Sequence, residues 1–190
     1  MKAIQMLKIA VLATAVLFSS CKKADNDPNN ADPSSSAFFS AKVDDQSFAK
    51  AELQLTTARF ISTTKMLQIS GQPADQKETI VLTLMPFGGK VATVADWKPG
   101  TYDFDPVHVT NMEYLASAEY NKWNGNSYEQ WFTKWDYVKT GKVIIESNSG
   151  THIKGAFSFD AVRKNNDGSF NAGSIKKITQ GKFDLAIKML

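Results

Sequence analysis

The sequence predicts an all-β domain, an antiparallel β-sandwich or calycin-like β-barrel with one short aromatic helix. Apolar and polar residues alternate with period two in several short runs, which is the pattern of an antiparallel sheet with one buried and one solvated face. Residues that favour turns, mainly Gly, Asn and Pro, separate these runs. Many short strands and few helices leave both a sandwich and a closed barrel open.

The first twenty residues have the build of a secretory signal peptide. Lys2 and Lys8 supply positive charge, and Ile9–Phe18 is an unbroken apolar run. A membrane-spanning helix needs about 20 apolar residues, so this run is too short to remain as an anchor. The small residues Ser19 and Ser20 follow it, as expected before a cleavage site. We therefore expect residues 1–20 to be removed.

The next residue, Cys21, is the only cysteine in the chain, so no intrachain disulfide can form. Together with Phe18 and the two serines, it resembles a bacterial lipobox. That resemblance implies that the Cys21 thiol accepts a diacylglycerol and that the new amino group is acylated. Two or more acyl chains hold a protein stably at a membrane. The membrane, contacted through the lipid on Cys21, is thus the first predicted partner.

Residues 21–36 follow as a polar segment, "CKKADNDPNNADPSSS". Such a segment cannot bury enough apolar surface to offset the entropy lost on ordering, so it predicts a disordered tether reaching about 20 Å. Residues 37–190 are then one β domain. Removal of residues 1–20 takes away two basic residues and no acidic one, which brings the charge close to zero. No basic run interleaves with aromatic residues, so no nucleic acid partner is predicted.

Turn residues and alternating runs place the strands of this domain. The segment "SNSG" (147–150) predicts a hairpin turn, and "NNDG" (165–168) supplies residues that tolerate positive φ at a turn. Gly181 lies inside a good strand pattern and indicates a β-bulge. The inward-facing residues predicted from the alternation are, in chain order, Phe39, Ala41 and Val43; Leu67 and Ile69; Ile80, Leu82 and Leu84; Ile153, Gly155, Phe157, Phe159 and Ala161; and Phe183, Leu185 and Ile187.

The segment Tyr102–Tyr137 holds all five tyrosines and three of the four tryptophans. Within it, the apolar residues of "SYEQWFTKWDY" do not alternate with polar residues in the two-residue period of the strands. Its aromatic residues recur at i, i+3, i+4 and i+7, which predicts one apolar stripe of a short helix. Ser127 and Gln130 have the spacing of a capping box at its start. The helical aromatic residues are Tyr128, Trp131, Phe132 and Trp135.

Two interpretations of this segment stay open. In the first, it is a ligand-binding surface on which aromatic faces stack against a sugar or another ring. The nearby side chains that would supply hydrogen bonds are Asn121, Asn124, Asn126 and Gln130. In the second, it is a structural plug that closes a barrel end or covers a sheet edge. An aromatic stripe at helical spacing is more often core than site. The candidate ligand-binding residues are Tyr120, Trp123, Tyr128, Trp131 and Trp135.

No motif points to an enzyme, a metal site or a cofactor. His108 and His152 are the only histidines, and neither has a metal-ligand spacing. No nucleophile elbow or phosphate-binding loop is present. Asp103 and Asp105 would share one face of a strand, which suits a pair of catalytic carboxylates or a solvated strand end equally well. We therefore expect a non-enzymatic protein without cofactor.

Four motifs carry a resemblance along nearly the whole mature chain. They are "FSAKVDDQSFAKA", "PGTYDF", "TGKVIIESNSGTHIKGAFSFDAV" and "ITQGKFDLAI". In this order they resemble a group of uncharacterised lipoproteins from Bacteroidota. The resemblance implies an all-β domain anchored by lipid at the outer membrane, on its periplasmic or surface face. The expected function is a structural or interaction module of the cell envelope that contacts an envelope protein, and the alternative is a protein that binds a glycan or small ligand through residues 102–137.

Overall fold

Strands make up most of the described chain. The computed structural model describes residues 37–48, 56–104 and 113–190. The chain divides into two units, residues 1–33 and 34–190, and all described residues belong to the second. The elements are β1 (Phe38–Val43), β2 (Gln46–Ser47), β3 (Thr57–Ile61), β4 (Met66–Gly71), β5 (Glu78–Pro86), the 3₁₀ helix η1 (Val94–Asp96), β6 (Gly100–Asp103), β7 (Tyr114–Trp123), β8 (Tyr128–Phe132), β9 (Lys142–Asn148), β10 (His152–Lys164) and β11 (Phe170–Met189).

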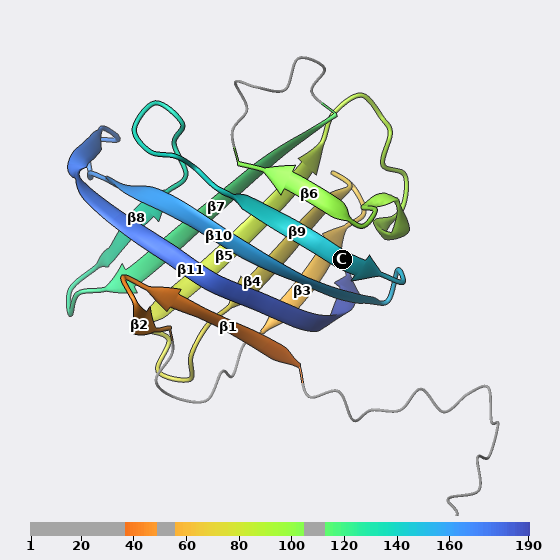
Figure 1. Ribbon diagram of the computed structural model, residues 1–190, viewed down its shortest axis with the longest axis horizontal. Coiled ribbons are helices and arrows are strands. Elements are labelled where there is room, and N and C mark those ends of the chain that lie inside the picture. The colour runs from red at the N-terminus through yellow and green to blue at the C-terminus, as the bar shows by residue number, and fades with distance from the viewer. Residues whose placement is uncertain (1–36, 49–55, 105–112) are drawn as a thin grey trace, which may run out of the picture. The chain divides into compact units, whose positions relative to one another are not determined.

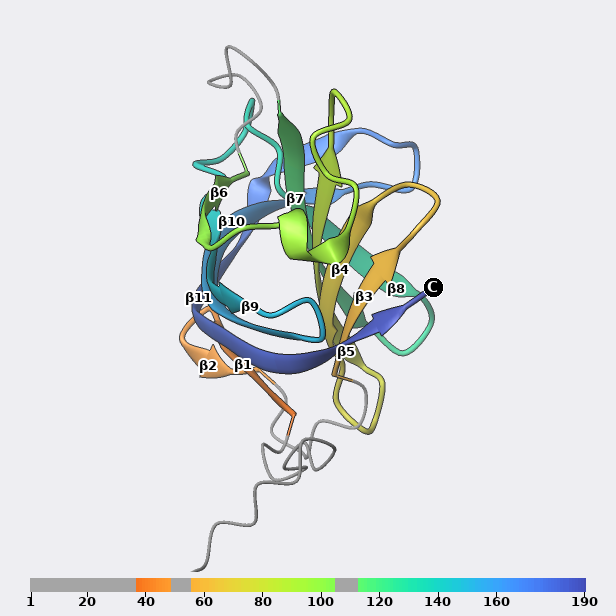
Figure 2. The same cartoon turned by 90° about the vertical axis from the view of Figure 1, so that its right-hand side faces the viewer.

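All eleven strands belong to one mixed sheet whose pairing returns on itself. The order is β2-β1-β11-β3-β4-β5-β7-β8-β10-β9-β6, and β10 also pairs with β11. The pairs are antiparallel except for β11 with β3, which is parallel. The strands form two crossing layers, with β1, β9, β10 and β11 in one and β3, β4, β5 and β7 in the other (Figures 1 and 2). The predicted all-β, sandwich- or barrel-like fold is confirmed.

The long strands β10 and β11 join the two layers. One part of β10, Ile153–Ser158, pairs with β9, and its last part, Val162–Lys164, pairs with β8 of the other layer. Likewise β11 pairs with β1 near its middle and with β3 through Ile187–Met189. Each strand therefore continues from one layer into the other, and the space between the layers holds the core.

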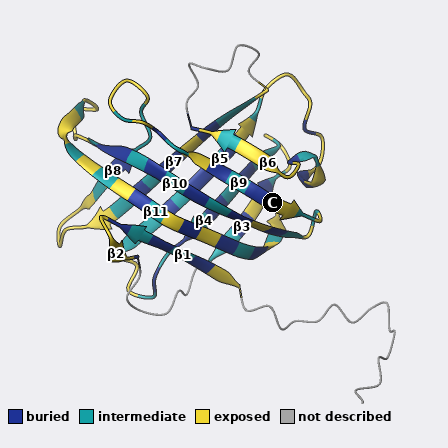
Figure 3. Ribbon diagram, viewed as in Figure 1, coloured by how far each residue is buried: buried dark blue, intermediate teal, exposed yellow. Residues whose placement is uncertain are grey.

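The core is built from the inward phase of the alternating runs. Buried and exposed residues alternate along the strands (Figure 3). All inward residues predicted from the sequence are buried, except Ile187, which is half-buried and packs against the core. The reason is the two-residue repeat of a strand, which sends successive side chains to opposite faces. The predicted hairpin turn forms after β9, and the turn predicted at residues 165–168 forms after β10.

Gly181 lies in a β-bulge, as predicted. Phe157 pairs with Gly181, but Phe159 pairs with Ile178, so β11 contains one extra residue opposite β10. The same extra residue appears opposite β1. Gln180 takes a positive φ of 53° at this point, and a bulge of this kind bends the strand and increases its twist. The bulge lies within the segment of β11 that pairs with β1, before the segment that pairs with β3.

The predicted aromatic helix is wrong, because Tyr128–Phe132 is strand β8. Tyrosine, tryptophan and phenylalanine also favour strands, and here the five-residue segment pairs on one side with β7 and on the other with β10. The ladder with β7 involves all five residues and the ladder with β10 involves Gln130–Phe132, so the sheet pairs backbone groups that an isolated short helix would have to satisfy alone. Ser127 is part of the β7–β8 turn, where its N–H donates to Asn124 Oδ1 rather than capping a helix.

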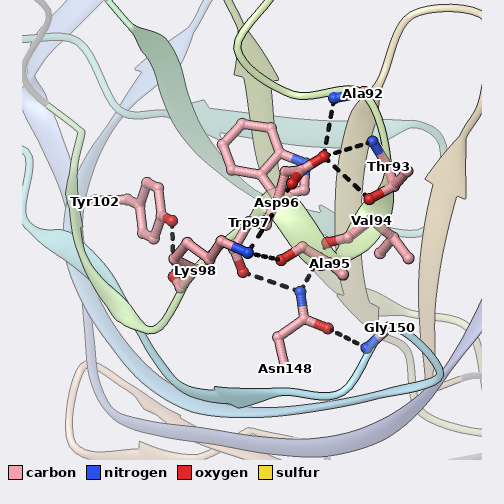
Figure 4. A network of polar contacts seen from close by, with 10 residues as sticks. All are labelled: Ala92, Thr93, Val94, Ala95, Asp96, Trp97, Lys98, Tyr102, Asn148 and Gly150. Carbon is pink, nitrogen blue, oxygen red and sulfur yellow. Dashed lines mark hydrogen bonds and ion pairs between the residues drawn. The ribbon is translucent and has the colours of Figure 1, made fainter.

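The segment around η1 lies across one end of the two layers (Figure 2). Trp97 directly follows η1, is buried in the core, and donates from Nε1 to Lys65 O at 3.2 Å. Asn148 Nδ2 donates to Val94 O at 2.8 Å and to Trp97 O at 2.9 Å, while Asn148 Oδ1 accepts from Gly150 N (Figure 4). The plug considered for the aromatic segment is thus supplied by Trp97, which the sequence analysis did not single out.

Candidate functional site

The β7–β8 hairpin carries four of the five candidate aromatic residues. Trp123 pairs with Tyr128, and Tyr120 pairs with Trp131. Because the two pairs are an odd number of residues apart along each strand, they lie on opposite faces of the sheet. Trp123 and Tyr128 are 38% and 45% exposed, whereas Tyr120 and Trp131 are only 1% and 3% exposed. The hairpin therefore has an aromatic pair outside and another in the core.

The outer pair is held in a defined geometry. The rings of Trp123 and Tyr128 meet edge to face with their centroids 5.2 Å apart. Tyr128 Oη donates to Gln76 O at 2.6 Å, which fixes the phenol ring against the β4–β5 loop. The next residues on this face are Asn121 and Gln130, which pair with each other across the ladder. Asn121 Oδ1 is buried and has no hydrogen-bond partner among the described residues. Two aromatic rings and two amides thus share the outer face.

The inner pair forms part of the hydrophobic core. The rings of Tyr120 and Trp131 lie 5.5 Å apart. Tyr120 Oη donates to Glu78 Oε1 at 3.1 Å, and Trp131 Nε1 donates to Ser174 Oγ at 3.4 Å. Burial, and then the negative charge of Glu78, raise the pKa of Tyr120. Both polar tips are therefore satisfied inside the protein, and the face of Trp131 is not open to a ligand in solvent.

Trp135 lies apart from the other candidates, in the connection between β8 and β9. It is 48% exposed. Two residues later, Tyr137 packs against Phe170 at a centroid distance of 5.6 Å, so this connection lies against the start of β11. Trp135 lines neither of the two pockets described below. The five candidates are thus not brought together into one surface.

A pocket of about 510 Å³, here called the end pocket, opens at the ends of β1 and β7 and beside Lys176 of β11. Two of the candidate aromatic residues, Tyr120 and Trp123, line it. The rest of its wall is largely charged. The charged residues are Asp44, Asp75, Lys77, Glu78, Lys122 and Lys176, and the others are Val43, Gln46, Ser47 and Pro73.

Ion pairs between residues from different parts of the chain connect the charged side chains that line this pocket. Lys176 Nζ donates to Asp44 Oδ2 at 2.6 Å, and Asp44 Oδ1 accepts from Lys177 N at 3.0 Å. Lys122 Nζ lies 3.6 Å from Glu78 Oε1. Burial alone would raise the pKa of Asp44, but the hydrogen bonds from Lys176 and Lys177 and the positive charges of Lys176 and Lys122 outweigh it, so that this pKa is lowered. Asp44 is therefore held as a carboxylate between two ammonium groups.

A second, larger pocket of about 980 Å³, here called the hairpin groove, lies between the β7–β8 and β10–β11 turns. Tyr128 is its aromatic residue, and Trp123 of the end pocket touches the Tyr128 ring. The outer aromatic pair therefore stands between the two pockets. The remaining lining is polar: Asn124, Ser127, Glu129, Gln130, Arg163, Lys164, Asn165, Asn166, Asp167 and Gly168.

The residues weighed for catalysis do not form a cluster in the described chain. The His152 side chain on β10 contacts the carboxylate of Asp184 on β11, and both side chains are about one-third exposed. Asp103 is exposed at the end of β6. Asp105 and His108 lie outside the described residues, as does Cys21. Within residues 37–48, 56–104 and 113–190, no three His, Cys, Asp or Glu side chains come close enough to share a metal ion. The same ranges contain no helix of the length and apolar character needed to span a membrane.

The charged residues of the end pocket were missed by the sequence analysis. Asp44 follows β1, Glu78 begins β5 and Lys122 lies near the end of β7, whereas Lys176 lies within β11, so the four residues come from distant parts of the chain. The sequence around each of these residues predicts only a solvent-exposed charged side chain. The only signal available was the strand phase, which puts Lys122 and Tyr120 on the same face. Their convergence is a result of strand order.

Residues 35–183 match a family model described as a domain of unknown function, DUF6252. The chain belongs to this family. The match covers the β domain almost to its end, and thus both pockets and the whole aromatic segment of this DUF6252 domain. No curated protein and no solved structure matches the chain.

Proposed function

We propose that this DUF6252 protein is a lipoprotein of the outer membrane, with a non-enzymatic interaction domain. The observation that supports a lipid anchor is the position of Cys21 in the sequence. It follows a short apolar run and precedes a polar segment that ends where the family match begins. Acylation at this sulfur would hold the domain at the membrane through two or more acyl chains.

The course of β1 supports an anchored binding domain. The described chain begins at Ala37 and runs along β1 to Val43 and Asp44, which line the end pocket. Phe38, at the start of β1, pairs with Asp184, which contacts His152 next to the β9–β10 turn. The chain thus enters the domain at the other end of β1 from the pocket.

The anchor is tested by the Cys21→Ser variant in the native host. We expect the wild-type protein in the membrane fraction and in the detergent phase of a phase separation, and the variant in the aqueous phase with unchanged stability of its β domain. Ser19→Ala is the matched control and stays with the membrane. Membrane retention of Cys21→Ser, or a native product whose mass shows a bare sulfur or an attached Met1, contradicts the proposal.

A second candidate function is binding of a glycan by the outer face of the β7–β8 hairpin. The exposed rings of Trp123 and Tyr128 beside the amides of Asn121 and Gln130 favour it. Aromatic side chains combine a large apolar face with a polar tip, which suits the apolar face of a sugar ring and its hydroxyls.

A glycan array tests this candidate with three single variants. We expect Trp123→Ala and Tyr128→Ala to lose binding, while Trp135→Ala, which removes an exposed tryptophan outside both pockets, keeps it. Trp131→Ala is not a suitable variant, because Trp131 is in the core. Equal loss in all three variants, or no glycan bound by the wild type, rejects the glycan function and leaves an envelope protein as the partner.

A further inference from the structure

The end pocket has the size and construction of a small-molecule site. Its volume of about 510 Å³ falls within the range of roughly 300–1,000 Å³ that ligand pockets occupy. Its wall comes from the β1–β2 turn, the β4–β5 loop, the end of β7 and Lys176 of β11. Trp123 at the end of β7 and the buried Tyr120 provide its aromatic surface.

The carboxylates of this pocket already have donors. Asp44 accepts hydrogen bonds from Lys176 Nζ and Lys177 N. Glu78 accepts one from Tyr120 Oη and lies within ion-pair distance of Lys122. Asp75 Oδ1 accepts from the Lys77 backbone N–H. Each of these three carboxylates therefore has at least one oxygen that already accepts a hydrogen bond from the protein.

The ammonium groups, in contrast, keep donors to spare. Lys122 Nζ is 3.6 Å from Glu78 and Lys77 Nζ is 3.9 Å from Asp75, distances longer than a normal hydrogen bond. A lysine carries three N–H donors, and the Lys122 and Lys77 side chains are 50% and 64% exposed. Lys122 and Lys77 therefore keep N–H donors that are available to a ligand, and these donors are positively charged.

We propose that the end pocket binds the carboxylate or phosphate group of a small sugar-sized ligand, with Lys122 and Lys77 donating to the acidic group and Trp123 contacting its ring. An oxyanion supplies the acceptors that the ammonium groups lack. The partly exposed position of the lysines makes the binding weak and dependent on salt. This site shares Trp123 with the outer face of the hairpin, but its donors, Lys122 and Lys77, are not part of the glycan candidate, so substitutions of the two lysines test it separately.

The test is a titration of the ¹⁵N-labelled β domain with glucuronate, glucose 6-phosphate and glucose, followed by NMR at low salt. Both acidic sugars are expected to shift backbone amides at residues 43–47, 73–78 and 120–123, and glucose is not. A response to only one of the acids assigns the acidic group. Equal shifts from glucose, or no shift in these three segments with either acid, overturn the proposal.

Four lysine variants locate the binding group. Lys122→Met and Lys77→Met keep most of the aliphatic stem and remove a donor each, and each is expected to weaken binding about tenfold. Lys122→Arg restores part of the affinity. Lys142→Met on β9 is the matched control, since Lys142 is exposed and does not line the pocket. An equal loss with Lys142→Met shows attraction by overall charge alone and overturns the proposal.

Discussion

Gly181 lies so close to the ring of Phe157 that a Cβ atom on the glycine would be 2.5 Å from Phe157 Cδ2 and Cε2. The two residues face each other across β10 and β11, at the bulge. Phe157 in turn packs against Phe39 and Phe183. The bulge and the aromatic core are therefore fitted to each other at this point.

Gly181→Ala is expected to lower the free energy of unfolding by about 1–3 kcal/mol, because the added methyl group forces the Phe157 ring out of its place. Urea denaturation of the purified domain measures the loss. The double variant Gly181→Ala/Phe157→Leu relieves the clash, so its loss should be smaller than the sum of the two single losses. Full additivity would show that the two residues are not coupled.

The tryptophans should separate into two classes of stability effect. Trp131→Ala leaves a cavity beside Tyr120 in the core and is expected to cost about 3–5 kcal/mol. Trp123→Ala and Trp135→Ala remove exposed side chains and should cost less than about 1 kcal/mol. Urea denaturation compares the three variants. A small loss in Trp131→Ala would contradict its assignment to the core.

Asn148 should anchor the segment that crosses the end of the sheet. Asn148→Ala removes the two hydrogen bonds to Val94 O and Trp97 O, and an unpaired carbonyl there costs about 1–3 kcal/mol. Asn165→Ala is the matched control, since its amide donates to the exposed Ser169 Oγ in a turn. Hydrogen exchange at Trp97 Nε1 should become faster in Asn148→Ala only. Unchanged exchange there would mean that Asn148 does not hold Trp97.

Asp44 should make the stability of the domain depend on acidity. Its pKa is lowered in the folded protein, so its contribution to stability is present above about pH 4 and is lost as the pH falls through the lowered folded value. Asp44 is 42% exposed, so the contribution is at most about 1 kcal/mol.

Urea denaturation of the Asp44→Asn variant and of the wild type between pH 2 and pH 7 measures the contribution of Asp44 to the free energy of unfolding. Asparagine tolerates the positive φ of 48° at this turn, so the turn is kept while the negative charge and one accepting oxygen are removed. The two stabilities should differ near pH 7 and converge at the acid end. Asp45→Asn removes a charge one residue away and keeps the contact of Asp44 with Lys176. A constant difference across the pH range would show that the charge of Asp44 is not the cause.

The sequence by itself determined the strand phases. The alternation in segments such as 153–161 and 183–187 assigned the core correctly, and Gly181 indicated the bulge. This works because the side-chain period of a strand is a local property of the backbone. It failed for residues 128–132, where helical spacing and strand alternation both describe the same aromatic residues.

Only the tertiary structure decided which strands become neighbours. Pairing with β7 and β10 made a strand of Tyr128–Phe132, sent Trp131 into the core and left Trp123 outside. It also brought Asp44, Glu78, Lys122 and Lys176 together around one pocket. The physical reason is that the pairing energy of a strand comes from backbone groups that every residue possesses. A local sequence can therefore state which face a side chain takes, but not which strand end it will meet.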